Sequence, residues 1–193
     1  MTRAPAYSLL LAAALVWGGS AQAADWAVDA GKSKLGFVGS QSGTPFEGRF
    51  SRWTAKIAFD PANPAAGTAV VVIDMSSATT GDLQKDQSLP QADWFDTKTF
   101  PQARFEATGF RAKGGNAFEA VGSLSLRGIK KDVVLPFTLD VSSAGAHPAV
   151  AHAQGKLILI RTDYGVGQGE WKVPDMVALE VAVTVDLTAT TAP

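Results

Sequence analysis

Alternation between apolar and polar residues is the feature of this sequence that most constrains its fold. In segment 177–187, six aliphatic residues at odd positions alternate with small or polar residues at even positions. A period of two residues is typical of a strand that buries one face, as in an antiparallel sheet. Similar segments recur along the chain, and we expect strands at 35–37, 57–59, 70–75, 118–126, 133–141 and 153–159.

Residues that favour turns separate these segments. Residues 60–67 contain two prolines and a glycine, and 113–116 read Lys-Gly-Gly-Asn, which is a hairpin signal. We also expect turns at 127–130 and 142–148. About eight strands at this spacing predict an all-β fold, a sandwich or an antiparallel up-and-down barrel, rather than βαβ units.

One region, residues 80–100, lacks the two-residue period. Thr79 or Thr80 is a candidate cap for a short helix that carries Asp82 and Asp86. Pro90 would end this helix because proline cannot continue it. We therefore expect a helical excursion around residues 81–95 that lies over one end of the barrel as a lid.

The first 23 residues have the features of a cleavable export signal. Arg3 supplies a positive charge, an apolar run covers 7–17, and Ala21-Gln22-Ala23 forms a small-x-small cleavage site. The apolar run is shorter than the roughly 20 residues that a membrane-spanning helix needs. We predict a signal peptide at 1–23, a periplasmic location and one domain at 24–193, with its body ending near Leu187.

Charge and cysteine content exclude several classes of protein. The chain has 17 Lys and Arg, 18 Asp and Glu, and no Cys. Loss of residues 1–23 removes Arg3 alone and leaves a formal charge of −2, without the basic balance typical of nucleic-acid binding. Disulfides and thiolate metal sites are excluded, and export without cysteine fits a bacterial periplasm.

The interior of an eight-stranded barrel is either filled by side chains or holds one small ligand. The expected inward faces are rich in Phe, Leu and Val, with small residues at Ala120, Gly122 and Gly155. These small residues would leave room for a ligand or would accommodate bulky neighbours. The pattern alone leaves both interpretations open.

Short motifs along the chain resemble those of the YceI-like family, exported lipocalin-like proteins associated with binding polyisoprenoids. Their order carries the resemblance more than any single motif does. The motifs are Trp26-Ala27-Val28-Asp29, Ser33 to Phe37, Gly48-Arg49-Phe50, Ile57 to Asp60, Val70 to Asp74, Thr80-Gly81-Asp82 with Asp86 and Leu89, Trp94-Phe95-Asp96, Phe100-Pro101, Phe105, Gly122 to Lys131, Arg161 to Val166 and Asp175-Met176-Val177.

The resemblance implies a barrel of about eight strands around an elongated apolar tunnel. The ligand would carry a long prenyl or acyl tail and would be held without covalent chemistry or a further cofactor. Trp94 and Tyr164 stand where phenylalanine is more usual in the family, which bears on the head group that fits. The expected ligand-binding residues are Phe37, Phe59, Trp94, Phe95, Phe105, Phe118, Leu124, Phe137, Leu157, Leu159, Arg161 and Tyr164.

Arg161 continues the inward register of Leu157 and Leu159, so its charge needs a partner. Two interpretations stay open. In the first, Arg161 pairs with Asp163 and closes one barrel end. In the second, its guanidinium contacts a phosphate or quinone oxygen of the ligand head group.

The sequence offers little for catalysis or metal binding. There is no Gly-x-Ser-x-Gly motif, and we interpret His147 and His152 as exposed. Residues 165–169 do not fit a phosphate-binding loop and are expected to form a flexible connection near Trp171. Asp82 and Asp86 are expected to be structural rather than metal ligands. We predict no catalytic or metal site.

Three functions remain from the sequence. The first is a carrier or scavenger of a polyisoprenoid, an isoprenoid quinone or a related lipid. The second is a protein–protein interaction or stress-protection module whose barrel is filled by its own side chains. The third is an enzyme, for which the neighbourhood of Arg161 and Asp163 alone offers titratable groups. Transient membrane contact and homodimerisation stay open as further alternatives.

Overall fold

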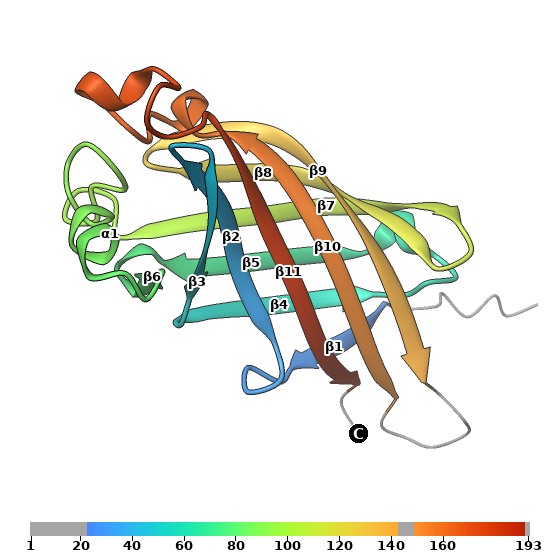
Figure 1. Ribbon diagram of the computed structural model, residues 1–193. Helices are drawn as coiled ribbons and strands as arrows, with labels where there is room; N and C mark the ends of the chain where they lie inside the picture. The colour runs from blue at the N-terminus through green and yellow to red at the C-terminus, as the bar shows by residue number, and fades with distance from the viewer. Residues whose placement is uncertain (1–22, 143–148, 192–193) are drawn as a thin grey trace, which may run out of the picture.

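The computed structural model describes residues 23–142 and 149–191 (Figure 1). The predicted signal segment, the 142–148 turn and His147 fall largely or wholly outside these residues. The described chain forms eleven strands and one short α-helix, α1 (Leu83–Ser88). The strands are β1 (Ala24–Val28), β2 (Lys34–Gln41), β3 (Thr44–Phe50), β4 (Trp53–Phe59), β5 (Thr68–Asp74), β6 (Ala78–Thr79), β7 (Gln102–Gly114), β8 (Ala117–Leu126), β9 (Ile129–Ser142), β10 (Val150–Ile160) and β11 (Glu180–Thr191).

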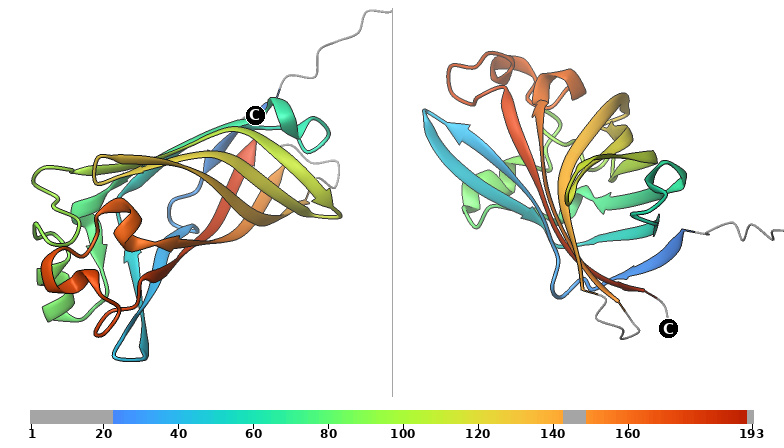
Figure 2. Two further views of the ribbon diagram at one scale, coloured as in Figure 1. Left: turned by 90° about the horizontal axis from the view of Figure 1, so that it is seen from above. Right: turned by 90° about the vertical axis from the view of Figure 1, so that its right-hand side faces the viewer.

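Eight of these strands form a closed antiparallel barrel. The order around the ring is β1-β4-β5-β7-β8-β9-β10-β11, and pairing of β1 with β11 closes it. Strands β2, β3 and β6 extend the sheet beyond this ring (Figures 1 and 2). The all-β fold expected from the two-residue period is therefore confirmed, and of the sandwich and the barrel it is the barrel, as the family resemblance implied.

The last strand, β11, holds three neighbours together. Along one edge it pairs with the whole of β10, from Val150↔Thr190 to Ile160↔Glu180. Along the other edge, residues 182–186 pair with β2 and residues 189–191 pair with β1. The second edge of β11 is therefore shared: β1 pairs with its C-terminal end, and the β2–β3 hairpin pairs with its middle part.

The predicted strand at 177–187 is displaced towards the C-terminus. Val177 and Leu179 precede β11, although Val177 keeps one isolated bridge to Gln41. The carbonyl of Leu179 accepts a hydrogen bond from Arg161 N, which ties it to the loop after β10. Alternation alone could not mark this boundary, because loop residues that pack on the core also show it.

The hairpin signals are confirmed at two places. Gly114 ends β7 and Gly115 follows it in the turn to β8, with φ of 105° and 58°, a region that glycine enters without steric cost. Arg127 and Gly128 join β8 to β9 with φ of 51° and 75°. These turns place three long strands side by side in one wall of the barrel.

The excursion at 80–100 contains the expected short helix, with a different cap. Asp82, rather than Thr79 or Thr80, is the N-cap, and its side chain accepts from Lys85 N at 3.0 Å. The hydroxyls of Thr79 and Thr80 instead donate to the carboxylate of Asp86 at 2.6 and 2.8 Å. α1 ends at Ser88, two residues before Pro90.

None of the helices among residues 23–142 and 149–191 has the length and apolar character needed to cross a bilayer.

Candidate ligand-binding cavity

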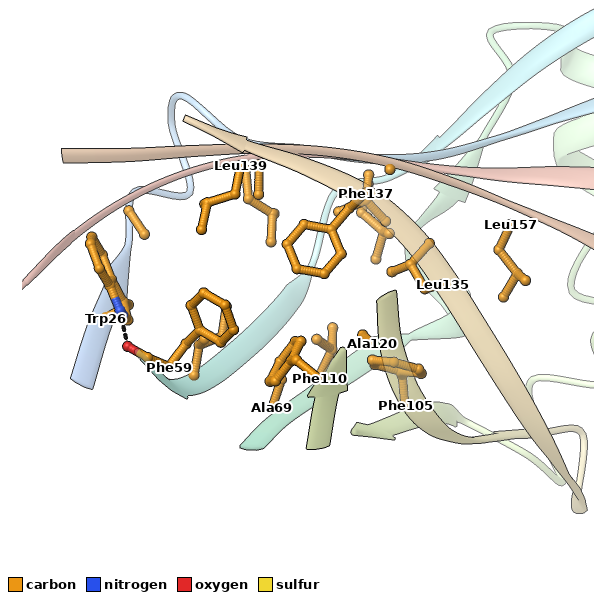
Figure 3. A pocket seen from close by; sticks show the side chains of 18 of the residues that line it. Trp26, Phe59, Ala69, Phe105, Phe110, Ala120, Leu135, Phe137, Leu139 and Leu157 are labelled. Carbon is orange, nitrogen blue, oxygen red and sulfur yellow. Dashed lines mark hydrogen bonds between the residues drawn. The ribbon is translucent and has the colours of Figure 1, made fainter. Parts of the chain in front are cut away.

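The main cavity lies inside the barrel and has a volume of about 160 Å³. Its lining comes from the inward faces of the ring strands and β2, and contains only apolar residues. Figure 3 shows side chains from both sides of the barrel, including Phe105, Leu135 and Leu157, that point into a common space. Trp26 Nε1 donates to the carbonyl of Phe59 at 2.9 Å and so satisfies the one polar atom of that indole.

An aromatic cluster forms the wall near one end of this cavity. The Phe59 ring lies 4.7 Å from Phe110 and 5.5 Å from Phe118, both edge to face. Phe137 lies 5.9 Å from Phe110 and stacks on Phe118 at 5.7 Å. Such contacts fix ring orientation, so the wall keeps its shape without a ligand.

Small residues on inward faces serve two different purposes. Ala120 and Gly155 line the main cavity, together with Ala69, Ala151 and Ala153, and give it room. Gly122 does not line it. A Cβ at Gly122 would lie 1.9 Å from the carbonyl oxygen of Glu106, so this glycine permits close approach of two backbones.

A second cavity of about 120 Å³ lies at the end of the barrel that carries α1. It shares four lining residues with the main cavity, namely Leu35, Ile73, Leu124 and Val183. The two cavities therefore adjoin along the barrel. Three rings beside the second cavity, Phe37, Phe50 and Phe95, pack together with centroids 5.4 to 6.4 Å apart.

Arg161 is the only charged residue in the lining of the second cavity, and it is 4% exposed. Of the two interpretations left open for Arg161, the pair with Asp163 does not form in the structure. Asp163 binds Lys131 at 2.9 Å, while Arg161 donates to four backbone carbonyls, those of Val166, Trp171, Val177 and Ala178. In the short helical turn at Arg161–Tyr164, Arg161 and Tyr164 are buried while Asp163 is exposed.

These carbonyls neutralise a buried charge by hydrogen bonding instead of by a carboxylate. Arginine has five N–H donors, and the four carbonyls occupy Nε, both hydrogens of Nη2 and one of Nη1. The guanidinium also lies 5.5 Å from the Trp94 ring centroid. Burial lowers the pKa of Arg161 from its ordinary value and raises the pKa of Tyr164 beside it.

The loop around Arg161 is joined to the α1 excursion by several contacts. Gly167 N and Gln168 N both donate to the carbonyl of Asp93 at 2.8 Å, and Trp94 packs on Trp171 at 5.6 Å. A Cβ at Gly167 would lie 1.8 Å from Arg161 Nη1, so only glycine fits there. Segment 165–169 is thus a hydrogen-bonded part of the lid, not the flexible connection predicted from its glycines.

The structure places eleven of the twelve predicted site residues on the two cavities. Phe59, Phe105, Leu124, Phe137 and Leu157 line the main cavity. The second cavity is lined by Leu124 again and by Phe37, Trp94, Phe95, Leu159, Arg161 and Tyr164. Phe118 lines neither and packs behind Phe59 and Phe137.

Several lining residues were missed from the sequence. Trp26, Leu35, Trp53, Ile57 and Ile73 face the main cavity from β1, β2, β4 and β5, as does Phe110 from β7. Leu35 and Ile57 were assigned to strand faces together with chosen residues, so their faces already carried the signal. Phe110 gave no such signal because a bulge at Ala107/Gly109 reverses the register of β7 before it.

The polar residues considered for chemistry have structural partners. Asp86 accepts from Thr79, Thr80 and Gly81, and Asp82 caps α1. His152 lies on β10, with Nε2 2.7 Å from Asp186 Oδ1 on β11. Across residues 23–142 and 149–191, no group of three or more His, Asp and Glu side chains is placed to hold a metal ion.

Comparison with known proteins agrees with this geometry. The family model described as YceI-like domain matches residues 26–189. The chain belongs to the YceI-like family. A UPF0312 protein of Pseudomonas savastanoi pv. phaseolicola is 30% identical over 137 residues, which cover 69% of this chain and 71% of the relative. A UPF0312 protein of Azotobacter vinelandii is 32% identical over 132 residues, covering 66% and 68%.

Solved structures of the YceI-like fold are also similar. BcnA of Burkholderia cenocepacia superposes with a TM-score of 0.80 at 36% identity, covering 85% of this chain and all of that protein. A polyisoprenoid-binding domain from Saccharophagus degradans, implicated in plant cell wall breakdown, superposes with a TM-score of 0.65 at 19% identity. The superposition covers 88% of this chain and 99% of that domain. At 19% identity, this similarity is evidence for a shared fold.

Proposed function

We propose that this YceI-like protein binds a long apolar ligand in its barrel without covalent chemistry or catalysis. The ligand class is a polyisoprenoid, an isoprenoid quinone or a related lipid. The observation that carries the proposal is the pair of adjoining cavities, whose lining holds no charged residue except Arg161. The polyisoprenoid-binding domain of Saccharophagus degradans, which has the same fold, supports it.

Desolvation of the ligand tail would provide the affinity. Burial of each methylene contributes about 0.8 kcal/mol, so a tail that fills both cavities gains several kcal/mol over a short one. The aromatic cluster is already ordered by ring contacts, which lowers the entropy cost of binding. Such a site selects for an apolar tail of the right length more than for a particular head group.

Arg161 has a limited part in head-group recognition in this proposal. Its four bonds to carbonyls leave one N–H, on Nη1, for a ligand oxygen. A single donor orients a hydroxyl, carbonyl or phosphate oxygen but does not clamp it in the bidentate way usual for arginine. The export signal predicted at 1–23 makes the periplasm the compartment in which the protein would carry or sequester this lipid.

Mass spectrometry of an organic extract tests the proposal. The protein is purified from its native compartment, and a stoichiometric prenyl or acyl lipid is expected. Ala153→Trp fills the main cavity and should abolish lipid recovery, whereas Gln154→Trp, on the outer face, should not. An empty barrel that also fails to take up added prenols would overturn the proposal and favour a self-filled interaction module.

A further inference from the structure

The wall of the barrel opens between β9 and β10. These strands pair from Val150↔Ser142 to Gly155↔Phe137, where the ladder ends. Both strands continue beyond that point, because β9 stays paired with β8 to Ile129 and β10 stays paired with β11 to Ile160. Figure 2 shows the two strands together at one end and apart at the other. We call the unpaired stretch, 129–136 facing 156–160, the side opening.

The outer rim of the side opening is apolar. Val134 on β9 is 40% exposed, and Ile158 and Ile160 on β10 are 51% and 37% exposed. If the ladder continued in its register, Val134 would face Ile158 directly, and each would shield the other. The fork in the sheet removes these cross-strand neighbours, and the side chains are exposed to a similar extent as Val141 and Val150 at the paired end.

The inner side of the same stretch leads to the main cavity. Leu135 and Phe137 line that cavity from β9, and Gly155 and Leu157 line it from β10. Phe137 and Gly155 also line a depression of about 770 Å³ on the outer face of the sheet. Where the β9–β10 ladder ends, the same residues therefore border both the ligand space and the outer depression.

An exposed ion pair bridges the wide end of the side opening. Lys131 on β9 binds Asp163 in the turn after β10 at 2.9 Å, and both side chains are about half exposed. Lys131 Nζ also lies 5.9 Å from the Tyr164 ring centroid. Solvent-exposed pairs of this kind contribute little to stability and are weakened by salt, so the bridge can open readily.

The lid is held much more firmly than this bridge. Arg161 fixes the loop 161–178 through four carbonyls of that loop, and two backbone bonds from Gly167 and Gln168 to Asp93 join the loop to the α1 excursion, 81–95; the loop and the excursion together are the lid. Lifting the α1 excursion off this loop would break both bonds to Asp93, the Trp94–Trp171 contact and the bond from Arg127 to the Ala92 carbonyl. Widening the side opening breaks the exposed Lys131–Asp163 pair and loosens the packing of Arg127 and Ile129 beside Gly165. The lower barrier lies in the wall.

We propose that the ligand tail enters and leaves the barrel sideways, through the side opening, while the lid stays closed. Val134, Ile158 and Ile160 contact the tail first, and the Lys131–Asp163 pair controls the width. This inference rests on the proposed function, because it describes how the proposed lipid reaches its cavity.

A reversible cross-link tests the route. The chain has no cysteine, so Val134→Cys with Ile158→Cys introduces the only thiols. Oxidation should close the side opening and slow exchange of all-trans-retinol, a fluorescent isoprenoid alcohol, by at least about tenfold, and reduction should restore it. Thr138→Cys with Gln154→Cys is the matched control, since these residues are already paired and its cross-link should not change the rate.

Loosening the bridge is a second test, which does not depend on disulfide formation. Lys131→Met should speed retinol exchange several-fold and remove its acceleration by salt. Lys130→Met, whose pair with Glu106 on β7 lies across β8 and not across the side opening, should leave both unchanged. Unaltered exchange in Lys131→Met and in the oxidised Val134→Cys, Ile158→Cys protein would overturn the side route alone. Failure of the unmodified protein to bind retinol or added prenols at all would count against the proposed function.

Discussion

The guanidinium of Arg161 lies inside a loop that offers it only backbone carbonyls. Val166, Trp171, Val177 and Ala178 supply these carbonyls from a stretch of thirteen residues that has no strand ladder of its own. Each carbonyl would otherwise need another donor, since buried backbone groups are almost always paired. One side chain therefore organises the whole loop that covers the second cavity.

Replacing this side chain should be costly. We expect Arg161→Met to lower the free energy of unfolding by about 3 kcal/mol, because several buried carbonyls lose a charged donor. Arg161→Lys should recover little, since an ammonium cannot match the planar fork. Urea unfolding measures both variants. Arg52→Met is the control, as its exposed pair with Asp74 should contribute less than about 1 kcal/mol. A loss at position 161 no larger than at Arg52 would contradict this role.

Asp86 should make stability depend on pH in acid. Hydrogen bonds from Thr79 and Thr80 lower its pKa to about 2 in the folded protein. The unfolded value is about 3.9, so the folded state gains stability from this carboxylate above about pH 4 and loses it as pH falls towards 2. Asp86→Asn should flatten the acid limb of a stability–pH curve from thermal melts. An unchanged limb would show that Asp86 does not cause it.

At the scale of elements, β1 closes the ring although it has only five residues. It pairs with β4 on one side and β11 on the other, and the bond from Trp26 Nε1 to the Phe59 carbonyl fastens it to β4. Without β1, the ends of β4 and β11 would present unpaired edges, which favour association with other chains. The short strand β1 therefore covers the edges of β4 and β11 that other chains could pair with.

Removing the indole bond should loosen this closure. Trp26→Phe keeps an aromatic ring in the cavity but leaves the Phe59 carbonyl without its donor, which should cost about 1 kcal/mol. Hydrogen exchange should show faster exchange of the β1 and β4 amides in particular. Trp53→Phe, at another Trp of the cavity lining, is the control. Equal effects of the two substitutions would mean that the hydrogen bond is not what fastens β1.

Much of the barrel could be predicted from sequence because each strand buries one face. The alternation marks such strands directly, and it placed Phe137, Leu157 and Leu159 inward. It failed at Phe110, where a bulge in β7 reverses the faces, and at Val177, which packs beside Arg161 without being in β11. The partners of Arg161 could not be predicted at all, because backbone carbonyls carry no residue-type signature.

At the scale of the whole molecule, the two cavities adjoin along the barrel and share part of their lining, which we call the common wall. Leu35, Ile73, Leu124 and Val183 belong to both linings. A ligand long enough to pass this wall gains contacts in both cavities, while a short one gains them in only one. We therefore expect the affinity to depend on the length of the ligand tail, through the combined length of both cavities.

A bulky residue at the common wall should shorten the accepted tail. We expect Leu124→Trp to weaken binding of long prenols such as solanesol at least about tenfold while farnesol still binds, because the passage is blocked. Competition against bound retinol measures both. Ser125→Trp, one residue along β8 and on its other face, is the control. Equal loss for short and long prenols would argue against a continuous space.

The double pairing of β11 also bears on how the protein is made. β1, β2 and β10 all precede β11 in the chain, and each needs it for closure. While a ribosome or a translocation pore still holds residues 180–191, the earlier strands cannot complete the ring. If the predicted export signal operates, the polypeptide would stay unfolded enough to cross the membrane until its final strand emerges, and the ring of strands would close only on the far side.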